Sequence, residues 1–434
     1  MPADTSSSQV RPEQISATQA AQLLARREIT AERLTQACLD RISERESTIH
    51  AWTVVNASAA LEYARKLDRG PIQGLLHGLP LGIKDLFDTA DLPTSYGSPI
   101  YAGYRPKADA ASVALCRKAG AVVLGKTVTT EFATFQPGPT RNPRNPNYTP
   151  GGSSSGSAAA VADHMVPLAF GTQTAGSIIR PAAFCGIVGY KPSYGNIPRA
   201  GVKSLSESLD TVGGFARTVD DVALLAAALT HDRRLLNLDI DNAPRIGVFR
   251  SPQWTALDTD AQATLESVGE RLSHAGAHVR DAPRFDFFPG LVQLQQDIMA
   301  FEAYQALSHE RYCSPEEISA SLDELLSHGE SIDFKTHQNN LTAALSARQR
   351  MQDAFGDFDA IVTPGALGEA PLFESGTGDP VLCRGWTLLG LPCIQLPVGT
   401  GPNGLPLGVQ LVGRFAADYA LLQTARWVEK QLFR

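Results

Sequence analysis

The fold of this chain is decided by residues 150–192, which read PGGSSSGSAAAVADHMVPLAFGTQTAGSIIRPAAFCGIVGYKP. Two clusters of small residues, Gly151–Ser157 and Thr174–Ser177, stand on either side of an apolar segment. Glycine and serine at this density allow backbone N–H groups to face one point and hydroxyls to approach closely. Such runs are also typical of flexible linkers, but this one continues directly into AAAVA and MVPLAF, which have the composition of a core. The stretch therefore predicts an ordered site.

The chain as a whole has the composition of a soluble globular protein. Its 434 residues are 43% hydrophobic and 19% charged, with a net charge of −7 and no lysine or arginine block. We therefore expect a sizeable core and no nucleic-acid partner. The N-terminus has no apolar leader segment, and no apolar run of about 18 residues occurs. This predicts a cytoplasmic protein with no membrane partner. The six scattered cysteines form no C-x-x-C pair, which favours reduced thiols over disulfides or a zinc site.

Alternating strand and helix patterns predict an α/β fold. Residues 1–12 read as a disordered tail, and helical spacing, in two places behind Ser or Thr, predicts an N-terminal helical arm over 13–70. Strand and helix patterns then alternate, which predicts a mixed, largely parallel central sheet covered on both faces. Residues 287–355 are mostly helical in pattern. Because no repeat or charge run divides the chain, we expect one large α/β/α domain over 13–434.

A charged residue ends the first strong strand pattern. Lys84 follows the apolar run Pro80–Ile83, and lysine is rarely buried unless it is paired or has a function. A structural lysine whose ammonium group reaches the surface is the simpler interpretation of this strand by itself.

Two familiar site types fit the first Gly/Ser cluster poorly. A phosphate-binding loop requires a lysine at the position of Ser157 and a strand in front of the loop. A nucleophile elbow, G-x-S-x-G, is formally present at residues 152–156, but proline-broken coil precedes it and only His164 is close in sequence.

A third type is a serine nucleophile that is activated without histidine. Burial lowers the pKa of a lysine and can leave it neutral, so that Lys84 becomes an available base. A second serine can relay the proton between the lysine and the nucleophile. The N–H groups of Thr174–Ser177 are then available as an oxyanion hole, because small side chains leave the amides accessible.

The sequence GGSSSGSAAAVA followed by GTQTAGSIIRPAAFCGIVGYKP resembles the amidase signature family, whose members hydrolyse amides with a Ser–Ser–Lys triad. Further matching segments are GLPLGIKD, SLDTVGGFARTVDD, DAIVTP and PLGVQLVG, so that the resemblance spans roughly residues 16–430. It implies a single α/β/α domain around a mixed sheet, an acyl-enzyme mechanism, and no metal or cofactor.

Position by position, the resemblance assigns the site residues. Lys84 matches the catalytic lysine, Ser153 the bridging serine, and Ser177 the nucleophile that carries the acyl group. In the family, the peptide bond before the bridging serine is cis. The implied oxyanion hole consists of the N–H groups of Thr174, Ala175, Gly176 and Ser177, and the implied substrate contacts are Gly152, Ser155 and Arg180.

The stretch departs from the common family form G-T-D-T-G-G-S-I-R. Gln173 replaces the aspartate, Ala175 replaces a glycine, and an extra residue moves the arginine to Arg180, three places after the nucleophile. This form resembles the branch that includes malonamidase. If a helix begins at Ser177, three positions return Arg180 to the same face, where its guanidinium can hold a substrate carboxylate. A buried structural arginine would look the same in sequence.

Three functions follow from these observations. The leading hypothesis is a stand-alone amidase that acts with water on a small linear amide, with a carboxylate-bearing, malonamate-like amide as one candidate substrate and a homodimer left open. The alternative is an assembly component resembling the glutaminase subunit of tRNA-dependent amidotransferases. The third, an inactive binding protein, conflicts with the presence of all three triad residues. We expect residues 129–137 and 364–390 to line the pocket, but their sequences do not identify a substrate.

Overall fold

The computed structural model describes residues 11–432 of the chain. Its centre is one sheet of eleven strands in the order β1-β3-β2-β4-β6-β5-β10-β11-β9-β7-β8. The strands are β1 (Trp52–Val55), β2 (Pro80–Lys84), β3 (Val122–Thr127), β4 (Leu168–Gln173), β5 (Val188–Lys191), β6 (Thr211–Ala216), β7 (Arg245–Val248), β8 (His278–Asp281), β9 (Ala360–Pro364), β10 (Cys393–Thr400) and β11 (Pro406–Val412). The predicted α/β class with a mixed sheet is confirmed. The tail expected over residues 1–12 lies mostly outside the described residues.

The sheet contains less parallel pairing than the alternation of patterns suggested. Parallel pairs occur only in the groups β3-β2-β4 and β9-β7-β8. The other six of the ten pairings are antiparallel. The physical reason is local connectivity: β10 and β11 form a hairpin, and antiparallel neighbours need no crossover helix.

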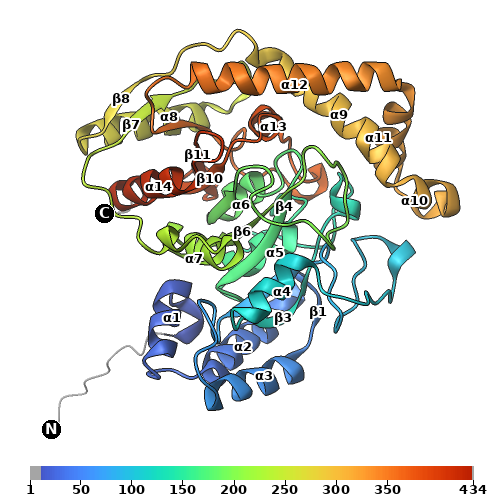
Figure 1. The fold of residues 1–434 in the computed structure, drawn as a ribbon, viewed down its shortest axis with the longest axis vertical. Coiled ribbons are helices and arrows are strands. Elements are labelled where there is room, and N and C mark those ends of the chain that lie inside the picture. The colour runs from blue at the N-terminus through green and yellow to red at the C-terminus, as the bar shows by residue number, and fades with distance from the viewer. Residues whose placement is uncertain (1–10, 433–434) are drawn as a thin grey trace.

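Helices cover both faces of the sheet (Figure 1). Fourteen are described: α1 (Ala17–Ala25), α2 (Ala31–Ile49), α3 (Ala57–Arg69), α4 (Ala111–Lys118), α5 (Ser155–Ala162), α6 (Ile179–Cys185), α7 (Val219–Thr230), α8 (Thr259–His274), α9 (Leu291–Ala306), α10 (Ser308–Cys313), α11 (Ala320–Ser331), α12 (Phe334–Ala354), α13 (Val381–Leu388) and α14 (Asp418–Leu432). Helices α9, α11 and α12 lie at the opposite end of the molecule from α1–α3 (Figure 1). Among the described residues, no helix is both long and apolar enough to cross a membrane.

Side-chain caps explain where several helices begin. Ser16, Thr30 and Asn56 each accept a hydrogen bond from a backbone N–H in the first turn of α1, α2 and α3. Thr218 caps α7 in the same way, through the N–H of Asp221. The Asp221 carboxylate does not close a reciprocal capping box; it accepts hydrogen bonds from Thr18 at the start of α1 instead. The N-terminal arm is therefore joined to a helix of the main body.

The N-terminal arm also contributes a strand that its helical pattern concealed. Trp52–Val55 forms β1, which pairs antiparallel with β3 at one edge of the sheet. Four residues are too few for a clear alternation between two faces, which is the sequence signal of a strand.

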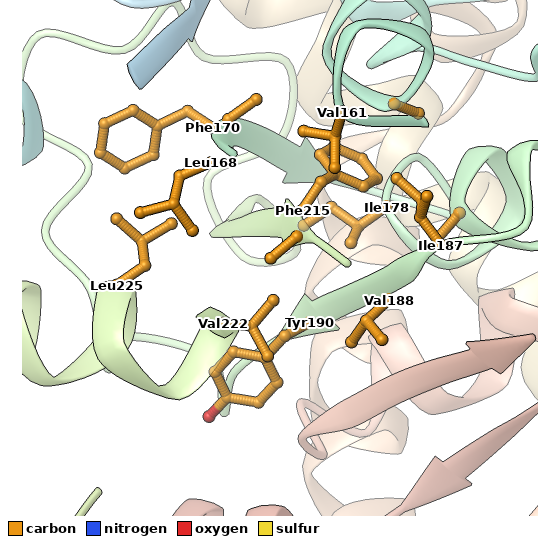
Figure 2. Packing of buried hydrophobic residues seen from close by; sticks show 14 of the residues in the cluster. Val161, Leu168, Phe170, Ile178, Ile187, Val188, Tyr190, Phe215, Val222 and Leu225 are labelled. Atoms are coloured by element: carbon orange, nitrogen blue, oxygen red, sulfur yellow. The ribbon is translucent and has the colours of Figure 1, made fainter. Parts of the chain in front are cut away.

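Apolar side chains on both faces of the central strands form the core (Figure 2). On one face, Leu168 of β4 lies beside Leu225 of α7. On the other, Phe215 of β6 lies with Ile178 and with Val161 of α5. All five are buried, and burying one such side chain contributes roughly 1.5–3 kcal/mol. This core holds β4, and hence the two segments that follow its carboxyl end, in a rigid position.

Candidate active site

Parallel pairing of β2 and β4 brings the candidate residues to one place. Leu81 and Gly82 of β2 pair with Leu168 and Ala169 of β4, so that both strands end at the same edge of the sheet. Lys84 is the last residue of β2 and has no exposed surface. Since β2 has a neighbour on each side and helices on both faces, its last side chain is enclosed.

Within residues 11–432, the side-chain nitrogen of Lys84 forms hydrogen bonds with hydroxyls only. Its Nζ donates hydrogen bonds to Ser153 Oγ at 2.8 Å and to Thr172 Oγ1 at 2.7 Å. Burial lowers the pKa of Lys84 to about 7, and the charge of Asp210 opposes that shift. The side chain is therefore neutral in a large fraction of molecules near neutral pH. This placement does not support the simpler interpretation of Lys84 as a lysine that reaches the surface.

Ser153 is held by a loop anchored to the end of β3. The Thr130 N–H donates to the Ser153 carbonyl at 3.1 Å, and the Gly156 N–H donates to the Val128 carbonyl at 3.0 Å. The Gly152–Ser153 peptide bond is cis. Gly151 has φ +81°, and a Cβ there would lie 2.9 Å from Pro181 Cα, so no other residue fits this turn.

Ser177 lies in the connection between β4 and α6, beside unpaired amides. Among residues 11–432, the N–H groups of Thr174, Ala175, Gly176 and Ser177 have no hydrogen-bond acceptor. The Ser177 hydroxyl likewise makes no hydrogen bond within that range, so no direct bond joins it to Ser153. Gly176 is required because a Cβ there would lie 2.9 Å from Pro380 and 3.2 Å from Cys383. The connection therefore combines an unbonded hydroxyl with free N–H donors.

Gln173, one of the departures from the family form, fixes this connection. Its Oε1 accepts hydrogen bonds from the N–H groups of Ile178 and Ile179 at 2.9 and 3.0 Å, at the start of α6. Its Nε2 donates to Thr387 Oγ1 at 3.0 Å, and that hydroxyl donates to the Ala175 carbonyl at 2.7 Å. An amide supplies both an acceptor and a donor here, which a carboxylate cannot do.

Arg180 is buried beside the nucleophile candidate. Helix α6 begins at Ile179 rather than at Ser177, but the Arg180 N–H bonds the Gly176 carbonyl at 2.9 Å, so one helical turn still separates Arg180 from Ser177. Its Nη2 donates to the Gly152 carbonyl at 2.7 Å. Within the described part of the chain, Nε and Nη1 have no hydrogen-bond partner, and no carboxylate forms an ion pair with this guanidinium. Burial lowers the pKa of Arg180 to about 10, which leaves it charged at neutral pH.

Three pockets surround these residues. A narrow one of about 20 Å³, here the nucleophile pocket, includes Ser177, Arg180, Phe135 and Pro380. An outer pocket of about 680 Å³ shares Phe135 and Pro380 with it. A third pocket of about 350 Å³ shares Thr174 with the nucleophile pocket and touches Thr172, the second partner of Lys84. The nucleophile candidate is thus enclosed but adjoins larger spaces.

Gly152 and Ser155, two of the implied substrate contacts, form hydrogen bonds within the protein. The Gly152 carbonyl accepts the bond from Arg180, and the Ser155 hydroxyl donates to the Gly151 carbonyl at 2.8 Å. Ser155 is buried as the first residue of α5. These contacts favour a structural role for both residues, in shaping the loop that carries Ser153.

Sequence reasoning missed some of the residues that complete the site. Asp210 accepts a hydrogen bond from Thr174 Oγ1 at 2.5 Å and bonds from the N–H groups of Leu205 and Ser206. It lies in SLDTVGGF, a segment singled out only as a match to the family. Thr172 stands two residues before Thr174, so the alternation of side chains along a strand predicts by itself that Thr172 and Thr174 face the same side. Among residues 11–432 no group of three His, Cys, Asp or Glu side chains is arranged to hold a metal.

The curated relatives overturn one prediction. The chain is 34% identical to a protein from Acidothermus cellulolyticus that is named as the A component of glutamyl-tRNA(Gln) amidotransferase, over 95% of this chain and 93% of that protein. That name refers to a tRNA-linked substrate and to an assembly, so the expectation of no nucleic-acid partner was wrong. It rested on net charge, which describes the whole surface and not a local contact. The relatives are named as amidotransferase components and not as malonamidases, so they do not support the predicted resemblance to the branch that includes malonamidase.

Solved structures agree with the fold. A crystal structure described as an amidase superposes with a TM-score of 0.89, at 30% identity, and covers 96% of this chain and 100% of that one. Native peptide amidase from Stenotrophomonas maltophilia superposes with a TM-score of 0.84, at 29% identity, over 97% of both chains. The sequence profile described as Amidase matches residues 33–422, and with these likenesses it shows that the chain belongs to the amidase family.

Proposed function

We propose that this chain cleaves an amide bond through an acyl-enzyme on Ser177. The observation that carries the proposal is the hydrogen bond from the fully buried Lys84 Nζ to Ser153 Oγ. Arg180, which lines the nucleophile pocket with Ser177, bonds the Gly152 carbonyl next to Ser153, and the N–H groups of residues 174–177 have no acceptor among the described residues. A serine hydroxyl needs a base to become a nucleophile, and a neutral lysine is such a base.

The proposed steps follow from these contacts. Neutral Lys84 takes the hydroxyl proton of Ser153. Ser153 in turn takes the hydroxyl proton of Ser177 while the Ser177 oxygen attacks the amide carbonyl. The N–H groups of residues 174–177 stabilise the negative charge on the carbonyl oxygen. The C–N bond then breaks, the nitrogen leaves with the proton returned through Ser153, and an ester remains on Ser177. Water cleaves that ester by the same route and releases the acid.

The proposed substrate class is a small amide that carries a carboxylate. Arg180 lines the nucleophile pocket with Ser177, and two of its guanidinium nitrogens lack partners among the described residues. A buried arginine with unsatisfied donors favours a planar anion that it can bind through two hydrogen bonds. Malonamate and glutamine are both amides of this class.

A second candidate function is favoured by the curated relatives: the amide-cleaving component of an amidotransferase. Relatives at 29–34% identity, matched over more than nine-tenths of this chain, are named as this component of glutamyl-tRNA(Gln) amidotransferase. In such a protein the nitrogen released at the site would be passed to an acceptor rather than lost to water. The chemistry at Ser177 is the same, and the two functions differ in the amide donor and in the need for partner proteins.

One assay distinguishes the two. The purified chain is incubated with malonamate, glutamine and the neutral amide propionamide, and ammonia is measured. Rapid turnover of malonamate by the chain alone would support the stand-alone amidase. Selective but slow turnover of glutamine, accelerated by glutamyl-tRNA(Gln) together with co-purified partner proteins, would support the amidotransferase role. No ammonia from any amide, with or without those additions, would refute amide cleavage.

A further inference from the structure

A second buried arginine, Arg384, stands beside the candidate pocket. It lies on α13, and only 4% of its surface is exposed. Its one hydrogen bond to the described part of the chain runs from Nη1 to Gln295 Oε1, and no carboxylate there forms an ion pair with it. A buried guanidinium without a carboxylate is costly unless something else uses its charge.

Arg384 is held by the same connection that carries the nucleophile candidate. Gln295, its partner on α9, donates from Nε2 to the Thr174 carbonyl at 2.9 Å. One turn after Arg384 on α13, Thr387 donates to the Ala175 carbonyl at 2.7 Å. Two independent contacts therefore fix the position of Arg384 relative to residues 174–177.

The pockets place Arg384 on the same side of the site as Arg180. Arg384 lines the outer pocket, which adjoins the nucleophile pocket through Phe135 and Pro380. Burial is the main cause that lowers the pKa of Arg180; the charge of Arg384 lowers it further, and that of Asp379 opposes the shift. An anionic ligand that spans both pockets would relieve this repulsion.

We propose that Arg384 is a specificity-determining residue that binds a second acidic group of the substrate. Arg180 then holds the carboxylate nearer the scissile amide, and Arg384 holds the one further out, so the substrate is a small amide with two acidic groups. The inference rests on the proposed function and narrows its substrate class.

Acidic side chains nearby leave the charge of Arg384 available. Asp258, Glu369 and Asp379 also line the outer pocket. The Asp379 carboxylate accepts the N–H of Val381 at 2.8 Å at the start of α13, and the Glu369 carboxylate accepts N–H groups of Asn403 and Leu405. Burial lowers the pKa of Arg384 to about 10, and the charge of Asp379 opposes that shift. Within the described residues none of these carboxylates, nor that of Glu324 in a neighbouring pocket, forms an ion pair with Arg384.

The test compares ligands that differ by one carboxylate. Succinamate has one carboxylate beside its amide, and the monoamide of tricarballylate has two. Both are titrated calorimetrically into Ser177→Ala and into Ser177→Ala/Arg384→Met, and both are assayed for ammonia release with the parent chain and with Arg384→Met. The matched control is Arg348→Met, which removes an arginine that contacts α13 through the Leu388 carbonyl at 2.9 Å. Circular dichroism establishes that each variant is folded.

Loss of one charge-assisted pair should weaken binding of the tricarballylate monoamide to Ser177→Ala, and its kcat/KM with the parent chain, about 10- to 100-fold. Succinamate should change less than about twofold in both measurements, and Arg348→Met should not separate the two amides. Equal losses for both amides in Arg384→Met, or failure of the tricarballylate monoamide to bind Ser177→Ala more tightly than succinamate, would overturn the proposal. Tight binding of the tricarballylate monoamide without ammonia release by the parent chain would leave Arg384 as an anion site and refute the proposed function instead.

Discussion

Lys84 and Lys126 lie on the neighbouring parallel strands β2 and β3, and both are fully buried, yet their partners differ in kind. Lys126 Nζ forms an ion pair with Asp85 at 2.9 Å and donates to the Phe87 carbonyl and to Thr94. Lys84 Nζ has hydroxyl partners only. The charge of Lys126 is therefore balanced by a carboxylate, whereas Lys84 can become neutral by losing its proton.

Activity should fall at acid pH because Lys84 becomes protonated. Burial places the pKa of Lys84 at about 7, and the neutral form is the proposed base. The kcat/KM of a neutral amide should therefore drop about tenfold per pH unit well below 7 and level off above 8. Lys84→Ala should lower kcat about 10²- to 10⁴-fold. A flat profile between pH 5 and 8, or a Lys84→Ala variant with parental activity, would mean that another base is used.

Lys126 serves as the structural counterpart of Lys84. Lys126→Met leaves Asp85 as a buried carboxylate without its ion-pair partner, which should cost roughly 3–5 kcal/mol of unfolding free energy. Lys84→Met leaves only hydroxyls without a partner and should cost much less. Urea unfolding of the two variants measures both. Equal losses would show that the Lys126–Asp85 pair contributes no more than the contacts of Lys84.

Ser177 should carry the acyl group. A slow ester or anilide substrate is expected to add its acyl mass to the peptide containing Ser177, and hydroxylamine should divert that group to a hydroxamate. Ser177→Ala should abolish both signals. Ser155→Ala is the matched control, because its hydroxyl bonds the Gly151 carbonyl. Acyl mass on Ser153 or Ser154 would reassign the nucleophile.

Gln173 should be needed for the geometry of the candidate oxyanion hole. Gln173→Leu removes the acceptor for two N–H groups at the start of α6, which should cost about 1–3 kcal/mol of stability. Gln173→Glu keeps the acceptor oxygens but loses the donor to Thr387. We expect Gln173→Leu to lower kcat more than Gln173→Glu. The reverse order in steady-state assays would show that the bond to Thr387 is the more important one.

The local patterns predicted the α/β class of the fold and the residues that the structure brings together as the candidate site. The apolar run ending at Lys84 and the Gly/Ser clusters predicted a strand end and two loops, and these lie together because β2 and β4 are parallel neighbours. Pairing direction was less predictable, since a strand's own pattern does not encode its neighbour. Gln295 was not predicted, and Arg384 was predicted only as part of the pocket-lining segment 364–390, because their positions depend on how α9 and α13 pack over the connection, more than 100 residues along the chain.

Substitutions of Arg180 can distinguish a substrate-binding role of this residue from a structural one. Its Nη2 supports the loop through the Gly152 carbonyl, while Nε and Nη1 lack partners among residues 11–432. Arg180→Gln is chosen because a side-chain amide can keep a donor toward Gly152 without the charge, and Arg180→Leu removes both. If Arg180 holds a carboxylate, both variants should lose about 10- to 100-fold in kcat/KM for malonamate, from roughly 1.5–3 kcal/mol of charge-assisted bonding. Propionamide should be affected only by Arg180→Leu, because the loop beside Ser153 then loses its support. Equal losses on both amides in Arg180→Gln, with a lower melting temperature, would assign Arg180 to the loop alone.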